Sequence, residues 1–145
     1  MTEFGLRRNI EVALRSIEWW RRGNGCVPIY NLMEDAATAE ICRAQIGQRI
    51  RYSAGLDDGC DVSSTLLEGL LDEIVKSVRD VMGDDALHAS QFARAGKIVR
   101  ELSEGEFREF LTTTASQHLS SIHIGRGPGR RYAFELGKYV TPYHL

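Results

Sequence analysis

The sequence is poor in cysteine and proline, with three of each in 145 residues, and it lacks an apolar run near the ~18–20 residues that cross a bilayer. The odd number of cysteines and the absence of a CxxC spacing argue against a disulfide framework and a zinc site. The N-terminal stretch MTEFGLRRNIE carries charges where a signal peptide needs apolar residues. We therefore expect a protein of a reducing compartment, with the cytoplasm as the default and no membrane partner.

Neither sign of charge dominates: 18 Lys and Arg stand against 20 Asp and Glu, which gives a net charge of −2. This balance provides no general attraction to nucleic acid, so no nucleic-acid partner is expected. The four histidines have no ligand spacing on a helix, and we predict no metal site. A chain of this length, with 43% hydrophobic residues, can bury a core without disulfides or metals.

Apolar residues recur at helical spacing in five segments. These segments predict helices at 5–22, from 35 to about 53, at 64–82, at 90–102, and a short one that opens with Ser103 and Glu106 as a capping box. Thr65 and Glu68 form a second predicted capping box, and Gly83 is the predicted C-cap of the third helix. The segment from Cys26 to Leu32 contains a proline and is expected to be extended. The predicted fold class is therefore all-α, with five helices and one extended loop before the second helix.

The helical period ends at Thr112, and the segment from Gly125 to Arg131, GRGPGRR, is rich in glycine and arginine. It lacks the Lys-Ser/Thr of a phosphate-binding loop. This break in composition predicts a helical domain at 1–112 and an irregular, Gly/Arg-rich tail at 113–145.

Asp35 lies where the extended segment becomes the second helix. The ten residues before it carry one charge, Glu34, and the ten after it carry two, Glu40 and Arg43. A lone acid at such a junction is either the N-cap of the helix or a catalytic base. Spacing alone favours the cap, because aspartate is among the best N-cap residues.

The block GNGCVPIYNLMEDAATAEI, from Gly23 to Ile41, resembles the C-terminal helical domain of malate synthase, as do Arg8-Asn9-Ile10, Ile17-Glu18 and Arg43-Ala44-Gln45. The resemblance covers residues 1–112. It implies a helical plug that closes over a TIM barrel, where glyoxylate and Mg²⁺ bind. A barrel needs ~250 residues, so the chain cannot hold one beside this domain. We therefore expect a fragment of malate synthase that carries no cofactor of its own, needs a barrel domain or chain, and is incomplete as an enzyme alone.

The resemblance also implies residue roles. Asp35 would be the general base that takes a proton from the methyl group of acetyl-CoA, and Cys26, Met33 and Glu34 would lie near acetyl-CoA. Judged from the residues alone, Cys26 is a small buried apolar residue, while Met33 and Glu34 contribute shape without chemistry. Trp20 falls on the apolar stripe of the first helix and is expected in the core.

Two departures from the family pattern leave an alternative open. Gly47 stands within Ile46–Ile50, where the family usually has tryptophans, and in mid-helix it costs roughly 0.5–1 kcal/mol relative to Ala. The tail after Thr112 is foreign to the family. The alternative is a non-catalytic helical interaction module, or a remnant, that needs a separate barrel partner. In a eukaryote the glyoxysome or peroxisome is a second compartment, although the last three residues, Tyr143-His144-Leu145, resemble an SKL signal only distantly.

Overall fold

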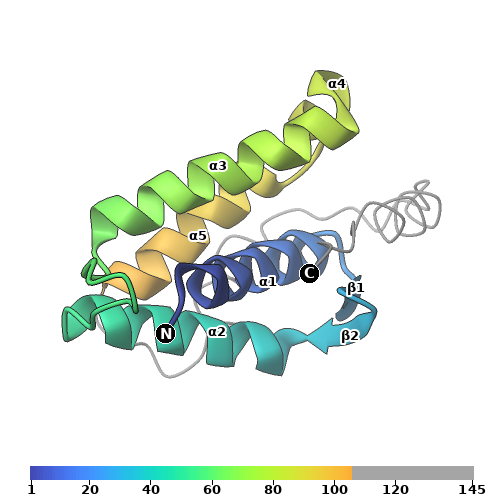
Figure 1. Ribbon diagram of the computed structural model, residues 1–145. Coiled ribbons are helices and arrows are strands. Elements are labelled where there is room, and N and C mark those ends of the chain that lie inside the picture. The colour runs from blue at the N-terminus through green and yellow to red at the C-terminus, as the bar shows by residue number, and fades with distance from the viewer. Residues whose placement is uncertain (106–145) are drawn as a thin grey trace.

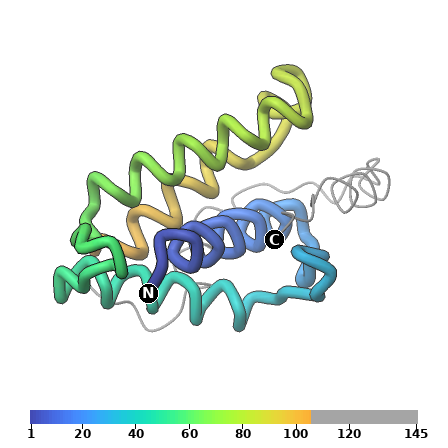
Figure 2. The backbone as a smooth tube through the Cα atoms, in the orientation of Figure 1, coloured from blue at the N-terminus to red at the C-terminus, as the bar shows by residue number. Residues whose placement is uncertain are grey.

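The computed structural model describes residues 1–105, which form five helices and one two-stranded hairpin (Figure 1). The elements are α1 (Glu3–Arg21), β1 (Cys26–Ile29), β2 (Leu32–Asp35), α2 (Ala36–Arg51), α3 (Ser64–Met82), α4 (Asp84–Ala89) and α5 (Phe92–Glu104). The chain runs along α1 to the hairpin and returns along α2, and α3 and α5 then cross the pair as a second antiparallel layer (Figure 2). The predicted helical class is confirmed.

The core is centred on α1, which packs against α2, α3 and α5. Its predicted apolar stripe is buried, and this stripe consists of Leu6, Ile10, Ala13, Leu14 and Ile17. Trp20 is the exception, because it is only half-buried at the end of the helix. The buried part of the apolar stripe thus ends at Ile17, one turn before the end of α1.

The ends of α3 are set by two small residues. Ser63 is the N-cap, and its Oγ accepts a hydrogen bond from the Leu66 amide at 3.2 Å. The predicted capping box of Thr65 and Glu68 is therefore wrong, and Glu68 instead forms an ion pair of 3.0 Å with Arg100 on α5. Gly83 ends α3 with φ +81°, as predicted for a C-cap, since glycine adopts positive φ without steric cost.

The C-terminal part of the described chain differs from the prediction in two ways. A short helix, α4, follows α3 and was not predicted. Helix α5 continues through Ser103, which is buried inside it and does not open a new helix. The rest of the predicted fifth helix, the boundary at 112 and the tail lie outside the described residues.

The extended segment before α2 is an antiparallel hairpin. The pairing of Ile29 with Leu32 leaves a two-residue turn of Tyr30 and Asn31, whose φ angles are +52° and +61°. Positive φ at both central residues is the property of a type I′ turn, which matches the twist of a hairpin. We did not predict β2, because a tyrosine is an unusual residue at this position of the turn.

Gly47 lies where α2 packs against Ser103 of α5. A Cβ atom at this position would lie 3.0 Å from the backbone oxygen of Ser103. The glycine therefore allows two helices to pack closely, and its expected cost to α2 is offset by this contact.

No helix in residues 1–105 combines the length and the apolar character needed to cross a bilayer.

We expect Gly47→Ala to lower the free energy of unfolding by about 0.5–2 kcal/mol, because the clash with Ser103 outweighs the gain in helix propensity. Gly69→Ala is the matched control: Gly69 lies within α3 and has open space around it, so alanine should raise stability by about 0.5–1 kcal/mol. Urea denaturation of the two variants measures both changes. Equal stabilisation by both substitutions would show that α2 and α5 do not touch at this point.

Candidate active site at the hairpin–helix junction

Asp35 is both the last residue of β2 and the N-cap of α2. Its backbone is extended, with φ −124° and ψ −173°, so the chain changes from strand to helix directly after it. Its Oδ1 atom accepts hydrogen bonds from the Ala37 amide at 2.9 Å and from the Thr38 amide at 3.1 Å. The capping role that the sequence favoured is therefore present.

The cap occupies only one of the two carboxylate oxygens. The Thr38 hydroxyl, at 3.4 Å, also points to Oδ1, and no hydrogen bond or ion pair from residues 1–105 ends on Oδ2. Asp35 is exposed, so Oδ2 remains accessible while the amides hold the group in place. The arrangement provides a fixed anionic oxygen that can accept a proton.

Met33 and Cys26 share a face of the hairpin with Asp35. Met33 is two residues before Asp35 on β2, and Cys26 is the cross-strand partner of Asp35 in the register. Met33 is 69% exposed, and Cys26 is also exposed. The interpretation of Cys26 as a buried apolar residue is therefore wrong. The structure brings three of the four predicted site residues together on one surface.

Glu34 lies on the opposite face of β2 and is half-buried. It faces the helices, and its charge acts on Cys42 of α2. Burial, with a smaller contribution from Glu34, raises the pKa of the Cys42 thiol to about 11. Glu34 thus lies on the side of the hairpin away from Met33.

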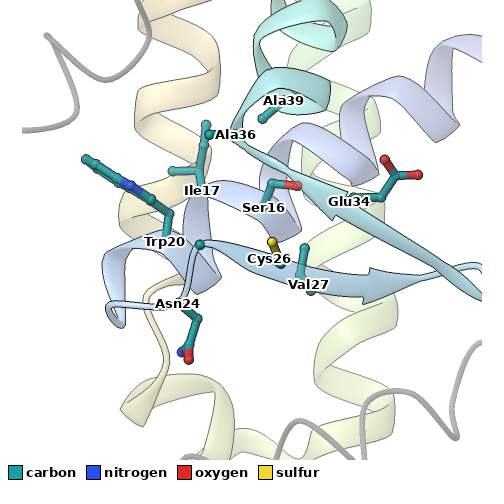
Figure 3. A pocket seen from close by; sticks show the side chains of 10 residues that line it. Ser16, Ile17, Trp20, Asn24, Cys26, Val27, Glu34, Ala36 and Ala39 are labelled. Atoms are coloured by element: carbon teal, nitrogen blue, oxygen red, sulfur yellow. The ribbon is translucent and has the colours of Figure 1, made fainter.

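A small pocket lies behind the hairpin, between α1, β1 and the start of α2 (Figure 3). Ser16, Trp20, Cys26 and Ala36 are among the residues that line it. Its volume is about 10 Å³, which is room for a single water molecule and too little for an acyl group. This pocket therefore offers no room for a small-molecule ligand beside Asp35.

The turn of the hairpin is attached to α1 through Tyr30. The hydroxyl group of Tyr30 donates a hydrogen bond to Glu11, and the Arg8 guanidinium lies 4.3 Å from the centre of the Tyr30 ring. This contact could not be predicted from local spacing, because Tyr30 and Glu11 are 19 residues apart. Helix α1 thereby fixes the far end of the strand that carries Asp35.

The described residues offer no ligand set for the Mg²⁺ that the family resemblance implies. Between residues 1 and 105, no group of three or more His, Cys, Asp or Glu is placed to hold a metal ion. Of the four histidines only His88 belongs to this part of the chain.

The three thiols should react with Ellman's reagent at different rates. We expect Cys26 to react fastest, and Cys60 more slowly because the Asp58 carboxylate raises the pKa of its thiol. Buried Cys42 should react only after unfolding. Cys26→Ser is the control and should remove the fast phase; a fast phase that survives this substitution would contradict the exposed position of Cys26.

Comparison with known proteins points to one family. The family model "Malate synthase, C-terminal" matches residues 1–119. The chain is 42% identical to malate synthase A of Escherichia coli (strain K12) over 112 residues, which are 77% of this chain and 21% of that protein. It is 43% identical to malate synthase of Myxococcus xanthus (strain DK1622) over 121 residues, 83% of the chain and 22% of the relative. For the glyoxysomal malate synthase of Zea mays the identity is 40% over 128 residues, 86% of the chain and 23% of the relative. The chain spans about a fifth of the length of these relatives, and it belongs to the malate synthase C-terminal domain family.

Proposed function

We propose that this domain supplies the general base for the condensation of acetyl-CoA with glyoxylate, and that Asp35 is this base. The observation that carries the proposal is how the carboxylate of this exposed residue is bound: two helix amides donate to Oδ1, and no hydrogen bond from residues 1–105 ends on Oδ2. A general base must be held within hydrogen-bond reach of its proton, and such groups contribute roughly 10²–10⁴-fold to the rate. A fixed oxygen on a rigid junction meets that requirement better than a mobile side chain would.

In the proposed reaction, Oδ2 of Asp35 takes a proton from the methyl carbon of acetyl-CoA. The electron pair of the broken C–H bond then attacks the aldehyde carbon of glyoxylate, and the aldehyde oxygen gains a proton. Water next cleaves the thioester bond, which releases malate and CoA. Mg²⁺, held by the barrel, would polarise the glyoxylate carbonyl. This domain contributes the proton acceptor and part of the wall around the acyl group.

The neighbours of Asp35 have separate proposed roles. Met33 and Cys26 share its exposed face, and we assign to them the contacts with the acetyl and thioester groups of acetyl-CoA. A flexible, polarisable methionine suits an apolar acyl group. Glu34 lies on the opposite face, and we assign it no contact with the substrate. The three thiols are free, which supports a reducing compartment, and we propose the cytoplasm, or the glyoxysome in a plant.

The partner in this proposal is a TIM barrel, as a domain or as a separate chain. Three large apolar side chains near Asp35 are more than half exposed: Leu32 (56%), Met33 (69%) and Ile41 (58%). Exposed apolar residues around a reactive group are typical of a surface that another protein covers. The same three residues also favour the second candidate function, a non-catalytic interaction module that docks on a barrel. The two candidates differ only in whether Asp35 takes part in the chemistry.

We expect Asp35→Asn to lower malate formation at least ~100-fold when the chain is assembled with a malate synthase barrel. Asparagine is as good an N-cap as aspartate, so the melting temperature and the binding to the barrel should not change. A coupled assay for released CoA measures the activity. The control is Ser63→Ala, which removes the cap of α3 and should cost about 1 kcal/mol of stability without affecting turnover. Full activity of Asp35→Asn would leave only the interaction module.

A further inference from the structure

The turn of the hairpin contains a residue in an unfavourable conformation. Tyr30 has φ +52°, in the left-handed region where a Cβ atom crowds the backbone. Asn31, at φ +61°, is one of the residues that tolerate this region, whereas a bulky aromatic residue there is an outlier. Such a conformation persists only when surrounding contacts impose it, and it is often found at functional sites.

The contacts that impose it all come from one face of α1. The hydroxyl group of Tyr30 donates to one oxygen of Glu11, and the other oxygen of Glu11 accepts from Arg15 at 2.7 Å. Arg8 lies against the ring at 4.3 Å, at cation–π distance. Burial is the main cause that raises the pKa of Tyr30, so its hydroxyl remains a donor over the physiological range. Three side chains of α1 thus hold one side chain of the turn.

We infer that Tyr30 is a positioning residue, which latches the hairpin onto α1 and thereby sets the direction in which β2 presents Met33 and Asp35. The inference rests on the proposed function. Strand β2 begins two residues after Tyr30 and ends at Asp35. One end of β2 is held by the contacts of Tyr30 with Glu11 and Arg8, which we call the Tyr30 latch. The other end is held by the cap of α2, so the two contacts together set the orientation of the strand. A misplacement of about 1 Å at a reacting group can reduce a rate by about 100-fold.

A role in stability alone would predict a different result. The hairpin contributes only Val27 and Ile29 to the core, while most buried apolar residues lie on the helices. Loss of the Tyr30 latch should therefore loosen the hairpin without unfolding the domain. Tyr30→Asn separates the two readings, because asparagine suits the turn better than tyrosine but removes both the hydroxyl and the ring. If the Tyr30→Asn variant is as stable as the unsubstituted chain but less active, Tyr30 acts by positioning the site and not by stabilising the fold.

Tyr30→Phe is the direct test, since it removes only the hydroxyl group. In the full chain we expect hydrogen exchange of the hairpin amides to become roughly 10-fold faster, while the amides of α3 stay unchanged. In the chain assembled with a malate synthase barrel, kcat should fall roughly 10-fold and the KM for acetyl-CoA should change less than about twofold. Tyr30→Asn should lower kcat further. Tyr52→Phe is the matched control, because Tyr52 is 77% exposed at the other end of α2.

The partner of the latch gives a second check. Glu11→Ala removes the acceptor of the Tyr30 hydroxyl, so it should lower kcat at least as much as Tyr30→Phe. The double variant should lower kcat little further than Glu11→Ala, because the hydrogen bond is already lost. Additive losses would show that the two residues act independently. A kcat for Tyr30→Phe equal to that of the unsubstituted chain would overturn the inference.

Failure of the proposed function is a separate outcome. If the unsubstituted assembly forms no malate, the assignment of Asp35 as a base falls, and the positioning role falls with it, whatever the hydrogen exchange shows. If the unsubstituted assembly is active and Tyr30→Phe is equally active, only the positioning role is wrong. Faster hydrogen exchange in the hairpin with unchanged kcat would show that Tyr30 stabilises the hairpin without positioning the site, and would overturn the inference.

Discussion

The hydrogen bonds from the Ala37 and Thr38 amides to one oxygen of Asp35 are the contact on which the rest of the site depends. They start α2, end β2 and fix the carboxylate at the boundary. Because both bonds use Oδ1, the cap leaves Oδ2 outside the helix. The observed cap and the proposed role as a base are therefore compatible, since each would use a different oxygen of one group.

Helix α1 connects the helices and the hairpin that position this contact. Near its end, buried Glu18 forms an ion pair of 2.5 Å with Arg22 and accepts a hydrogen bond of 3.1 Å from the Gln91 amide just before α5. A buried charge that loses its partner is strongly destabilising, so this link ties α1 to α5 firmly. At its middle, α1 carries the residues that hold Tyr30. One helix thus supports both the core and the hairpin, and the position of Asp35 follows from it.

Sequence periodicity was sufficient for most of the helical frame, because α1, α2 and α3 have clear ends and α1 and α3 have long apolar stripes. It failed where the deciding contact is distant in sequence. The cost assigned to Gly47 ignored the approach of Ser103, 56 positions later. The contact that holds Tyr30 was missed because its partner, Glu11, lies 19 residues earlier. Spacing alone favoured the cap for Asp35, and only the family resemblance suggested a base.

The distance between Oδ2 of Asp35 and the methyl carbon of acetyl-CoA tests the central claim most directly. It can be measured in a crystal structure of this domain assembled with a malate synthase barrel and acetyl-CoA. We predict a separation of about 3–3.5 Å, with Oδ1 still bound to the amides of Ala37 and Thr38. A carboxylate that turns both oxygens toward the helix, or a methyl group beyond the reach of Oδ2, would contradict the assignment of Asp35 as the base.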